Sequence, residues 1–446
     1  MKILHYALGF APYRTGGLTK FCMDLMQQQL QQGHDVGLIW PGEMRFLGGK
    51  TRIRTGKKVA GVGSYEVINP TPVSYDEGIA DTRRFMEEGD LACYRAFFQH
   101  RKPQVLHVHT LMGLHMSMLT AAREQGIRLV FTTHDFFPIC PKVTLFRGNQ
   151  VCPTAKDCQY CTSCNTTALP TWKVQLLQSP FYRCVKNSAL VKKLRKGHRD
   201  AFLMDTGIDR QLEQAPGTHY LQLRRYYEKM LTMMDAIHYN STVSRKVYQA
   251  YMDIADGVVI PISHKDIADR REKKEFRSDL LKVTYLGPPG GAKGYFVLKA
   301  AMDRLWKQTD KVQLNVFFEP KDTPPYMRTH GRYAYEDLQR IFSQTDVLVA
   351  PSVWYETFGY TVLEALSFGV PVVISSNVGA QDILPEGAGV IVENISEENL
   401  ARCLQQLTAQ TLQEMNRVIL EKAQIQSMEQ VSEQIITKCY CVQMAE

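Results

Sequence analysis

Two glutamates on either side of a glycine form the strongest chemical signal in the sequence. Glu356 follows an apolar run that ends at Ala350, and Glu364 comes eight residues later, beyond Gly359. A glycine where a helix begins lets the backbone approach a ligand, and the free N–H groups there favour a phosphate. Carboxylates before and after such an anion site are suited to hold hydroxyl groups on both sides of a diphosphate. A capped surface helix with two solvated glutamates is the alternative.

Two glycine-containing loops follow other apolar runs. Gly16 and Gly17 stand between the run at residues 2–7 and an amphipathic stretch at 18–32, and Lys293 lies near the end of a Gly/Pro loop at 287–294. Such loops bring backbone N–H groups to an anion or a reacting centre, and a lysine adds positive charge. Plain strand-to-helix turns and a solvated lysine are the alternatives.

Histidines close two neighbouring apolar runs. His134 and Asp135 follow the run at residues 129–133, and His107 and His109 end the run at 105–109. Polar residues at the carboxyl ends of strands in a doubly wound sheet usually line a ligand site. We therefore expect His134 and His109 in the site, and packing or a supporting role for His107.

Five of the eleven cysteines fall within residues 140–164. A C-x2-C pair with further cysteines upstream fits a tetrahedral structural zinc site in a reducing compartment. We expect the ligands to be Cys140, Cys152, Cys158 and Cys161, with Cys164 as a substitute. Reduced cysteines without a metal are the alternative, and an iron–sulfur cluster is a more remote one.

These candidates lie at the ends of strands in two strand-and-helix units. Short apolar runs alternate with amphipathic runs over residues 2–134 and again over 283–374. The alternation predicts mostly parallel sheets covered by helices on both faces. We therefore expect an α/β protein with two Rossmann-like, doubly wound domains that face each other across a cleft. A cysteine-rich and helical insertion, at about residues 140–229, interrupts the first domain.

Composition excludes several classes of protein. The 446 residues suit two or three domains of about 150 residues each. Contents of 44% hydrophobic and 22% charged residues exclude a disordered or coiled-coil chain. The net charge of +8, from 53 basic and 45 acidic residues, is too small to predict a nucleic-acid partner. No apolar stretch approaches the ~20 residues that span a bilayer, and the N-terminus lacks the features of a signal peptide, so we expect a cytoplasmic protein.

One stretch is more basic than the rest. Residues 181–199 carry seven cations, namely Arg183, Lys186, Lys192, Lys193, Arg195, Lys196 and Arg199. A basic helical stretch is suited to a peripheral contact with an anionic membrane, here at the inner face of the cell membrane, or with a phosphorylated lipid acceptor. A solvated helix face is the alternative.

The segment around the two glutamates resembles a known family. Glu356 and Glu364 form the E-x7-E signature of retaining glycosyltransferases of family four, which have the GT-B fold, and the similarity extends from Gly331 to Asp382. The resemblance implies that Glu356 and the backbone of Thr357, Phe358 and Gly359 contact the donor sugar and its diphosphate. It also implies that Glu364 holds the ribose.

The resemblance assigns roles to the remaining candidates. Lys293 would neutralise the leaving diphosphate without a metal, Gly16 and Gly17 would face the diphosphate and the acceptor, and His134 would lie beside the transferred sugar. These implications make His134, Glu356 and Lys293 the catalytic residues and place His109 and Asp135 on the acceptor side. Pro288 departs from the pattern, because the family usually has an arginine at this position.

The family also implies a domain plan. Residues 1–260 would form the acceptor domain and 279–428 the nucleotide-sugar domain, and a C-terminal helix at about 429–446 would cross back to the first domain. The expected reaction moves a hexose or hexosamine from a UDP- or GDP-sugar to a saccharide or lipid-linked acceptor, with no cofactor for catalysis and with retention of anomeric configuration. The expected setting is cell-surface polysaccharide or glycolipid assembly.

A non-catalytic partner that binds a sugar nucleotide or glycan for another transferase is the alternative. Pro288 favours it, and the intact Glu356, Glu364 and Lys293 oppose it. An epimerase with the same fold and a membrane-binding scaffold explain fewer of the motifs.

Overall fold

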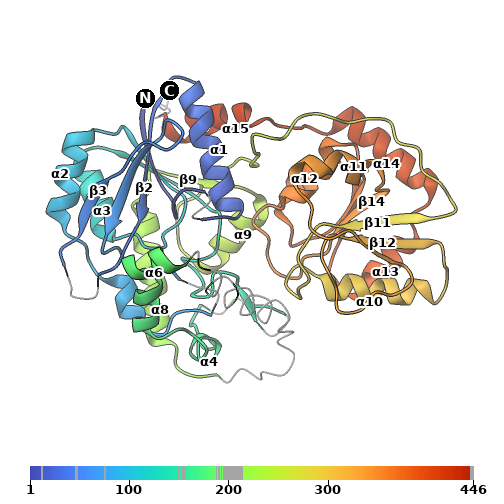
Figure 1. Cartoon of the computed structure of the whole chain (residues 1–446), viewed down its shortest axis with the longest axis horizontal. Helices are drawn as coiled ribbons and strands as arrows, with labels where there is room; N and C mark the ends of the chain where they lie inside the picture. The colour runs from blue at the N-terminus through green and yellow to red at the C-terminus, as the bar shows by residue number, and fades with distance from the viewer. Residues whose placement is uncertain are drawn as a thin grey trace.

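The apolar runs of the sequence form two separate sheets, seen side by side in Figure 1. The computed structural model describes residues 1–11, 14–45, 49–74, 77–147, 150–152, 156–186, 188, 191, 193 and 214–441. The first sheet has eight strands in the order β10-β9-β6-β5-β1-β2-β4-β3, and the second has six in the order β13-β12-β11-β14-β15-β16. All neighbouring strands in both sheets run parallel except the pair β3 and β4. The expected fold class, two Rossmann-like α/β domains, is confirmed.

The first domain carries its helices on both faces of the eight-stranded sheet. Its strands are β1 (Lys2–Tyr6), β2 (Asp35–Pro41), β3 (Arg52–Thr55), β4 (Gly63–Ile68), β5 (Val105–Val108), β6 (Arg128–Thr132), β9 (Ala236–Tyr239) and β10 (Val258–Val259). Its helices are α1 (Gly17–Gln31), η1 (Thr82–Met86), α2 (Leu91–Arg101), α3 (Met116–Glu124), α8 (Thr218–Thr232) and α9 (Thr242–Tyr251).

The second domain repeats the plan with a smaller sheet. Its strands are β11 (Leu281–Tyr285), β12 (Val312–Val316), β13 (Met327–Thr329), β14 (Val347–Ala350), β15 (Val372–Ser375) and β16 (Gly389–Val392). Its helices are α10 (Tyr295–Trp306), η2 (Tyr335–Asp337), α11 (Leu338–Ser343), α12 (Tyr360–Ser367), η3 (Gly379–Ile383), α13 (Glu397–Gln405) and α14 (Ala409–Lys422).

The segment between β6 and β9 is only partly separate from the first domain. It holds the short hairpin β7 (Phe146–Arg147) and β8 (Gln150–Val151) and the helices α4 (Cys161–Cys164), α5 (Thr171–Leu177) and α6 (Pro180–Val185). Helix α8, however, buries Tyr227 and Met230 in the same apolar cluster as Leu106 and Phe131 of the sheet. The amphipathic end of the expected insertion is therefore a core helix of the first domain.

The chain crosses between the domains twice. A linker leads from β10 to β11, and after α14 the chain returns to form α15 (Met428–Ile435) and η4 (Ile436–Tyr440) beside α1, as Figure 1 shows. The return is anchored on the first domain, since Ser432 Oγ donates to Gln32 Oε1 at 2.7 Å and Arg128 Nε donates to the carbonyl of Cys439 at 2.6 Å. Residues 442–446 of the predicted crossover lie outside the described residues.

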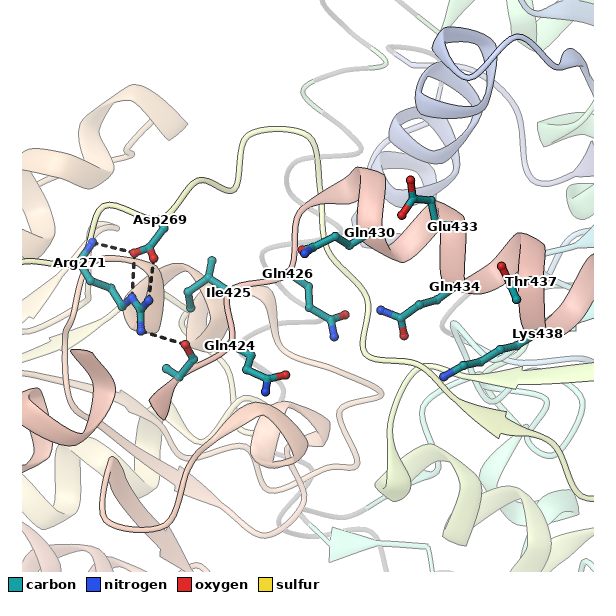
Figure 2. Close-up of a pocket in the computed structure, with 11 residues that line it drawn as sticks. Asp269, Arg271, Gln424, Ile425, Gln426, Gln430, Glu433, Gln434, Thr437 and Lys438 are labelled. Carbon is teal, nitrogen blue, oxygen red and sulfur yellow. Dashed lines mark hydrogen bonds and ion pairs between the residues drawn. The ribbon is translucent and has the colours of Figure 1, made fainter. Parts of the chain in front are cut away.

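The two crossings are tied to each other. Arg271 of the linker pairs with Asp269 and donates to the carbonyls of Ile419, Leu420 and Ala423 at the end of α14. An open, polar pocket of about 600 Å³ lies beside these Arg271 contacts. Its side chains come from both crossings and from α15 and η4 (Figure 2). The linker and the return segment are thus bonded to each other and together connect the two domains.

Among the described residues, no helix combines the length and the apolar character needed to cross a membrane.

Candidate active site

Lys293 and Glu356 meet at the carboxyl end of the second sheet. Lys293 follows β11 and Glu356 follows β14, and these neighbouring strands lie where the strand order changes direction, the usual ligand position in such sheets. Lys293 Nζ forms an ion pair with Glu356 Oε1, and Ser352 Oγ donates to Glu356 Oε2 at 2.8 Å. Burial raises the pKa of the Glu356 carboxyl, but the charge of Lys293 and these hydrogen bonds bring it below its ordinary value.

The loop that carries Lys293 is fixed by its glycine and by a tyrosine. Gly294 has φ +77°, and a Cβ there would lie 1.8 Å from the carbonyl oxygen of Pro351, so only glycine fits. The hydroxyl of Tyr285 donates to the carbonyls of Pro288 at 2.8 Å and Lys293 at 3.4 Å, which joins the two ends of the loop. Pro288 is exposed and brings no cation to the site.

The segment from Glu356 to Gly359 presents free backbone donors. Glu356 is held on both sides, because its N–H donates to Asn377 at 2.9 Å and its carbonyl accepts from Gly379 at 3.0 Å. The N–H groups of Thr357, Phe358 and Gly359 donate to none of the residues that the structure describes. Since Gly359 caps the N-terminus of α12, these groups form a turn of free donors at the positive end of a helix, a geometry suited to an anion.

Glu364 lies one turn into α12 and is mostly buried. Its Oε1 lies 3.4 Å from Nε2 of His264, a fully buried residue of the linker. His264 could not be predicted as a site residue, because nothing near it in the chain resembles a site motif. The linker therefore helps to position the carboxylate that we expected to hold a ribose.

The first domain brings His134 and Gly17 to the same place. Thr357 Oγ1 donates to the carbonyl of His134 at 3.3 Å, and Ser241 Oγ donates to the carbonyl of Thr357 at 2.6 Å. Gly17 begins α1 directly after Gly16, and a Cβ on Gly17 would lie 3.6 Å from the ring of Tyr360. The candidates from both domains thus meet around residues 356–360.

His109 and Asp135 differ in how they join this group. Nδ1 of His109 lies 3.1 Å from Nε2 of His134, so the two imidazoles are hydrogen-bonded. The carboxylate of Asp135 instead accepts from Thr110 Oγ1 at 3.1 Å and from the N–H of Phe137 at 3.0 Å. Burial outweighs these bonds and raises the pKa of Asp135 to about 6. No described residue links the Asp135 carboxylate directly to His134.

The five clustered cysteines lie near one another in the segment between β6 and β9. The thiols of Cys158 and Cys161 are hydrogen-bonded, and Cys140, Cys152 and Cys164 are close enough to interact electrostatically. In the described part of the chain, the groups of three or more side chains whose ligand atoms lie within 4.8 Å of one another include none of these five. Zinc at this cluster stays a prediction.

Most of the basic stretch cannot be placed, because Lys192, Arg195, Lys196 and Arg199 lie outside the described residues. Arg183 forms ion pairs with Glu66 and Glu43 of the first domain, so this cation contributes to an internal network. The expected membrane contact also stays a prediction.

Models of known families match both domains. Residues 15–157 match the model of Glycosyltransferase Family 4, and residues 282–410 match the model of Glycosyl transferases group 1. The matched ranges contain Gly16, Gly17, His109 and His134 in the first domain and Lys293, Glu356 and Glu364 in the second. No curated protein matches the sequence.

Solved structures resemble the chain over nearly its whole length. Sucrose-phosphate synthase from Thermosynechococcus elongatus is 15% identical, with a TM-score of 0.56 and coverage of 98% of this chain and 97% of that one. Anabaena HepE in complex with UDP is 14% identical, with a TM-score of 0.55 and coverage of 98% and 99%. The UDP-forming α,α-trehalose-phosphate synthase from Burkholderia xenovorans, in complex with glucose-6-phosphate, is 13% identical, with a TM-score of 0.55 and coverage of 98% and 99%.

These similarities fix the fold at low sequence identity, and the two family models add a glycosyltransferase match within each domain. The chain thus has the GT-B fold of those structures throughout, with a glycosyltransferase model matched in each domain.

Proposed function

We propose that this protein is a retaining hexosyltransferase that takes a hexose or hexosamine from a UDP- or GDP-sugar. The observation that carries the proposal is the Lys293–Glu356 ion pair beside the three free N–H groups at the start of α12. A diphosphate needs cations and N–H donors, and a sugar needs a carboxylate to accept from its hydroxyls. The structures of HepE with UDP and of a UDP-forming synthase support a nucleotide-sugar donor.

In the proposed reaction, the donor separates Lys293 from Glu356. The ammonium and the N-terminus of α12 then stabilise the charge that develops on the leaving diphosphate, while Glu356 accepts hydrogen bonds from the sugar. The acceptor hydroxyl attacks on the face from which the diphosphate leaves, through an oxocarbenium-like transition state. His134 lies beside the transferred sugar, and the acceptor contacts the first domain near His109 and Asp135.

Release of nucleotide from a panel of UDP- and GDP-sugars tests this proposal. We expect the wild type to release nucleotide from one donor, and Glu356→Gln to reduce the rate by about 100-fold or more. Glu386→Gln is the matched control, because Glu386 is exposed and makes no hydrogen bond or ion pair with the described residues. The anomeric configuration of the product tests retention.

The acceptor arms of the same assay separate the alternatives. Glucose-6-phosphate is one acceptor, because one structural relative binds it, and lipid-linked saccharides are another. Tight binding of a nucleotide with no release, whatever the acceptor, would overturn the enzyme in favour of a non-catalytic partner of another transferase.

We also propose that the enzyme works in cell-surface polysaccharide or glycolipid assembly, in peripheral contact with the cytoplasmic face of the membrane. Two exposed aromatic side chains support this setting, namely Trp172 of α5 and Phe181 of α6, which are 58% and 67% exposed. We expect co-sedimentation with anionic vesicles that is lost in a Trp172→Ser/Phe181→Ser variant. Equal sedimentation of both proteins would exclude this contact.

A further inference from the structure

Five buried or half-buried histidines of the first domain belong to one continuous set of hydrogen bonds. His5, His107, His109 and His238 are fully buried, and His134 is half-buried at the end of the set. Thr132, Tyr440, Gln29 and the backbone carbonyl of Ile260 complete it. We call these nine groups the histidine chain. Eight hydrogen bonds of 2.7–3.1 Å join its members in sequence.

The direction of the bonds is fixed at one end of the histidine chain. The carbonyl of Ile260 can only accept, so Nε2 of His238, 2.8 Å away, carries the hydrogen. A neutral imidazole has a single N–H, and therefore Nδ1 of His238 accepts from the hydroxyl of Thr132 at 2.9 Å. The oxygen of Thr132 in turn accepts from Nε2 of His107 at 2.7 Å.

The same rule carries the direction through the C-terminal crossing. Nδ1 of His107 must accept, and the hydroxyl of Tyr440 donates to it at 2.7 Å. The oxygen of Tyr440 then accepts from Nε2 of Gln29 at 3.0 Å, which leaves the amide oxygen of Gln29 to accept from Nε2 of His5 at 2.8 Å. Tyr440 thus connects His107, through Gln29, with His5, and the orientation of its hydroxyl fixes the direction of the hydrogen bonds beyond it.

The histidine chain ends at the site. Nδ1 of His5 accepts from Nε2 of His109 at 2.9 Å, and Nδ1 of His109 accepts from Nε2 of His134 at 3.1 Å. Nδ1 of His134 is left as an unprotonated acceptor that pairs with no described residue. His134 is the one histidine of the five that is only half-buried.

These hydrogen-bond directions require every imidazole to be neutral, and the packing of the rings favours the neutral form. The rings of His107 and His109 lie 4.0 Å apart, and those of His109 and His134 lie 5.3 Å apart, so a proton on one ring would be repelled by charge on the next. Burial lowers the pKa of His5 and His238 to about 4 and that of His134 to about 3, and it lowers the pKa of His107 and of His109 well below the ordinary value.

The same hydrogen bonds oppose a metal at the group of three buried histidines. His5, His107 and His109 place one nitrogen each within 4.8 Å of the others, as a metal site would require. However, both nitrogens of every ring already take part in hydrogen bonds of the histidine chain. A metal would have to break several of them at once.

We propose that the histidine chain holds His134 as the Nε2–H tautomer, so that its Nδ1 accepts a hydrogen bond from a hydroxyl of the donor sugar, and that Tyr440 is a positioning residue for His134. The second half of this inference rests on the proposed function, because it needs a sugar beside His134. The tautomer assignment itself is independent of any activity.

Nuclear magnetic resonance of the 15N-histidine-labelled, full-length protein tests the assignment directly. At neutral pH, all five histidines should be neutral and carry their hydrogen on Nε2. Tyr440→Phe should make His5, His109 and His134 mixtures of both tautomers, because the amide of Gln29 is then free to turn over. In the control, Tyr239→Phe, the tautomers should not change, since the Tyr239 hydroxyl is buried without a hydrogen bond. An imidazolium, or an Nδ1–H tautomer, among the five in the wild type would overturn the proposal.

Donor binding and kinetics test the positioning role. Addition of the active UDP- or GDP-sugar should shift the Nδ1 resonance of His134, whereas the free nucleotide should not. Tyr440→Phe should lower kcat about tenfold, the equivalent of one hydrogen bond, with unchanged nucleotide affinity. Gln29→Met breaks the next link, and the Gln29→Met/Tyr440→Phe double variant should lose no more than either single variant.

The two proposals fail in different ways. If the losses of kcat in the two single variants add up in the double variant, the role of Tyr440 is overturned even in an active enzyme. The same holds if Tyr440→Phe lowers only the nucleotide affinity. If no donor is turned over while all five tautomers are as expected, the proposed function fails and the positioning role with it, but the tautomer assignment stands.

Discussion

The Lys293–Glu356 ion pair occupies the groups that a donor needs. A donor that binds here must break the Lys293–Glu356 ion pair and replace it with contacts of its own. The ion pair therefore lowers the free energy gained on donor binding, while it keeps both side chains in place. With an exposed proline at 288, Lys293 is the cation of this loop that meets the Glu356 carboxylate.

Loss of the Lys293 charge should therefore impair turnover more than stability. We expect Lys293→Met to lower kcat/KM for the donor by about 100- to 1000-fold, the range for loss of a charge-stabilising group. The pKa of Glu356 should rise, because burial remains and the opposing charge is gone. Steady-state kinetics check the first effect, with Lys311→Met as a control at an exposed position of the same domain. Equal losses in both variants would argue against a specific role.

Asp135 makes stability depend on pH. Its pKa is raised from 3.8 to about 6, so the folded protein binds this proton more tightly than the unfolded chain does. The contribution is fully favourable below about pH 4 and is lost as the pH rises through 6, which amounts to about 3 kcal/mol at most. Asp135→Asn should gain stability relative to the wild type between pH 4 and pH 7. Denaturant unfolding at both pH values measures this difference, and a pH-independent difference would contradict the assignment.

At the residue scale, local spacing was sufficient for part of the site. Glu356, Glu364 and Lys293 lie in short motifs next to strands, so their neighbours in sequence are also their neighbours in space. The histidine chain could not be predicted in this way. His107 and Tyr440 are separated by 333 positions, and only the return crossing brings them within hydrogen-bond distance.

At the scale of elements, the loop at 287–294 that carries Lys293 depends on a single backbone conformation. Gly294 combines φ +77° with a close approach to the carbonyl of Pro351, whereas Gly33 has φ +82° and open space around it. We expect Gly33→Ala to cost about 1–2 kcal/mol, the strain of a left-handed residue, and Gly294→Ala to cost clearly more and to reduce donor binding. Urea denaturation compares the two. Equal losses of unfolding free energy in the two variants would show that the contact with Pro351 relaxes easily.

The cysteine cluster gives a second prediction at this scale. Protein purified without a chelator should contain about one zinc ion per chain, and Cys158→Ser should lower the zinc content, because three sulfurs and a hydroxyl bind zinc less tightly. Elemental analysis measures the ratio, and Cys403→Ser, at a free cysteine of the second domain, is the control. Metal-free wild type would leave reduced thiols as the interpretation.

Strands with long apolar runs were predictable, and short edge strands were not. β1 and β14 end within one residue of the apolar runs that predicted them, at 2–7 and at Ala350, because an apolar run buried on both faces usually forms a strand. β3, by contrast, has the sequence Arg-Ile-Arg-Thr and no buried residue, so only its pairing with β4 makes it a strand. The helical segment at 335–343 is divided into η2 and α11, since the carboxylate of Asp337 turns back to accept from the N–H of Ala334.

For the molecule as a whole, a few side chains hold the domains together at the site. Asp382 of η3 accepts hydrogen bonds from both the N–H and the hydroxyl of Thr242 at the start of α9. Together with the Ser241–Thr357 bond, these contacts place residues 356–360 against the first domain.

Removal of Asp382 should loosen this arrangement. We expect Asp382→Ala to increase the radius of gyration measured by small-angle X-ray scattering without ligand, and a saturating donor to reverse the increase, because the donor bridges both domains. Asp310→Ala, at an exposed position remote from the first domain, should scatter like the wild type. An unchanged radius in Asp382→Ala would mean that the remaining contacts suffice.

The return of the chain to its first domain has a consequence for synthesis. The second domain is continuous in sequence, so it can complete its sheet as soon as β16 has left the ribosome. The first domain lacks α15 and η4 until residues 428–440 have been made, and until then His107 and Gln29 have no Tyr440 to bind. We therefore expect the domain that is translated second to mature first, and the histidine chain to close only after that domain has been synthesised.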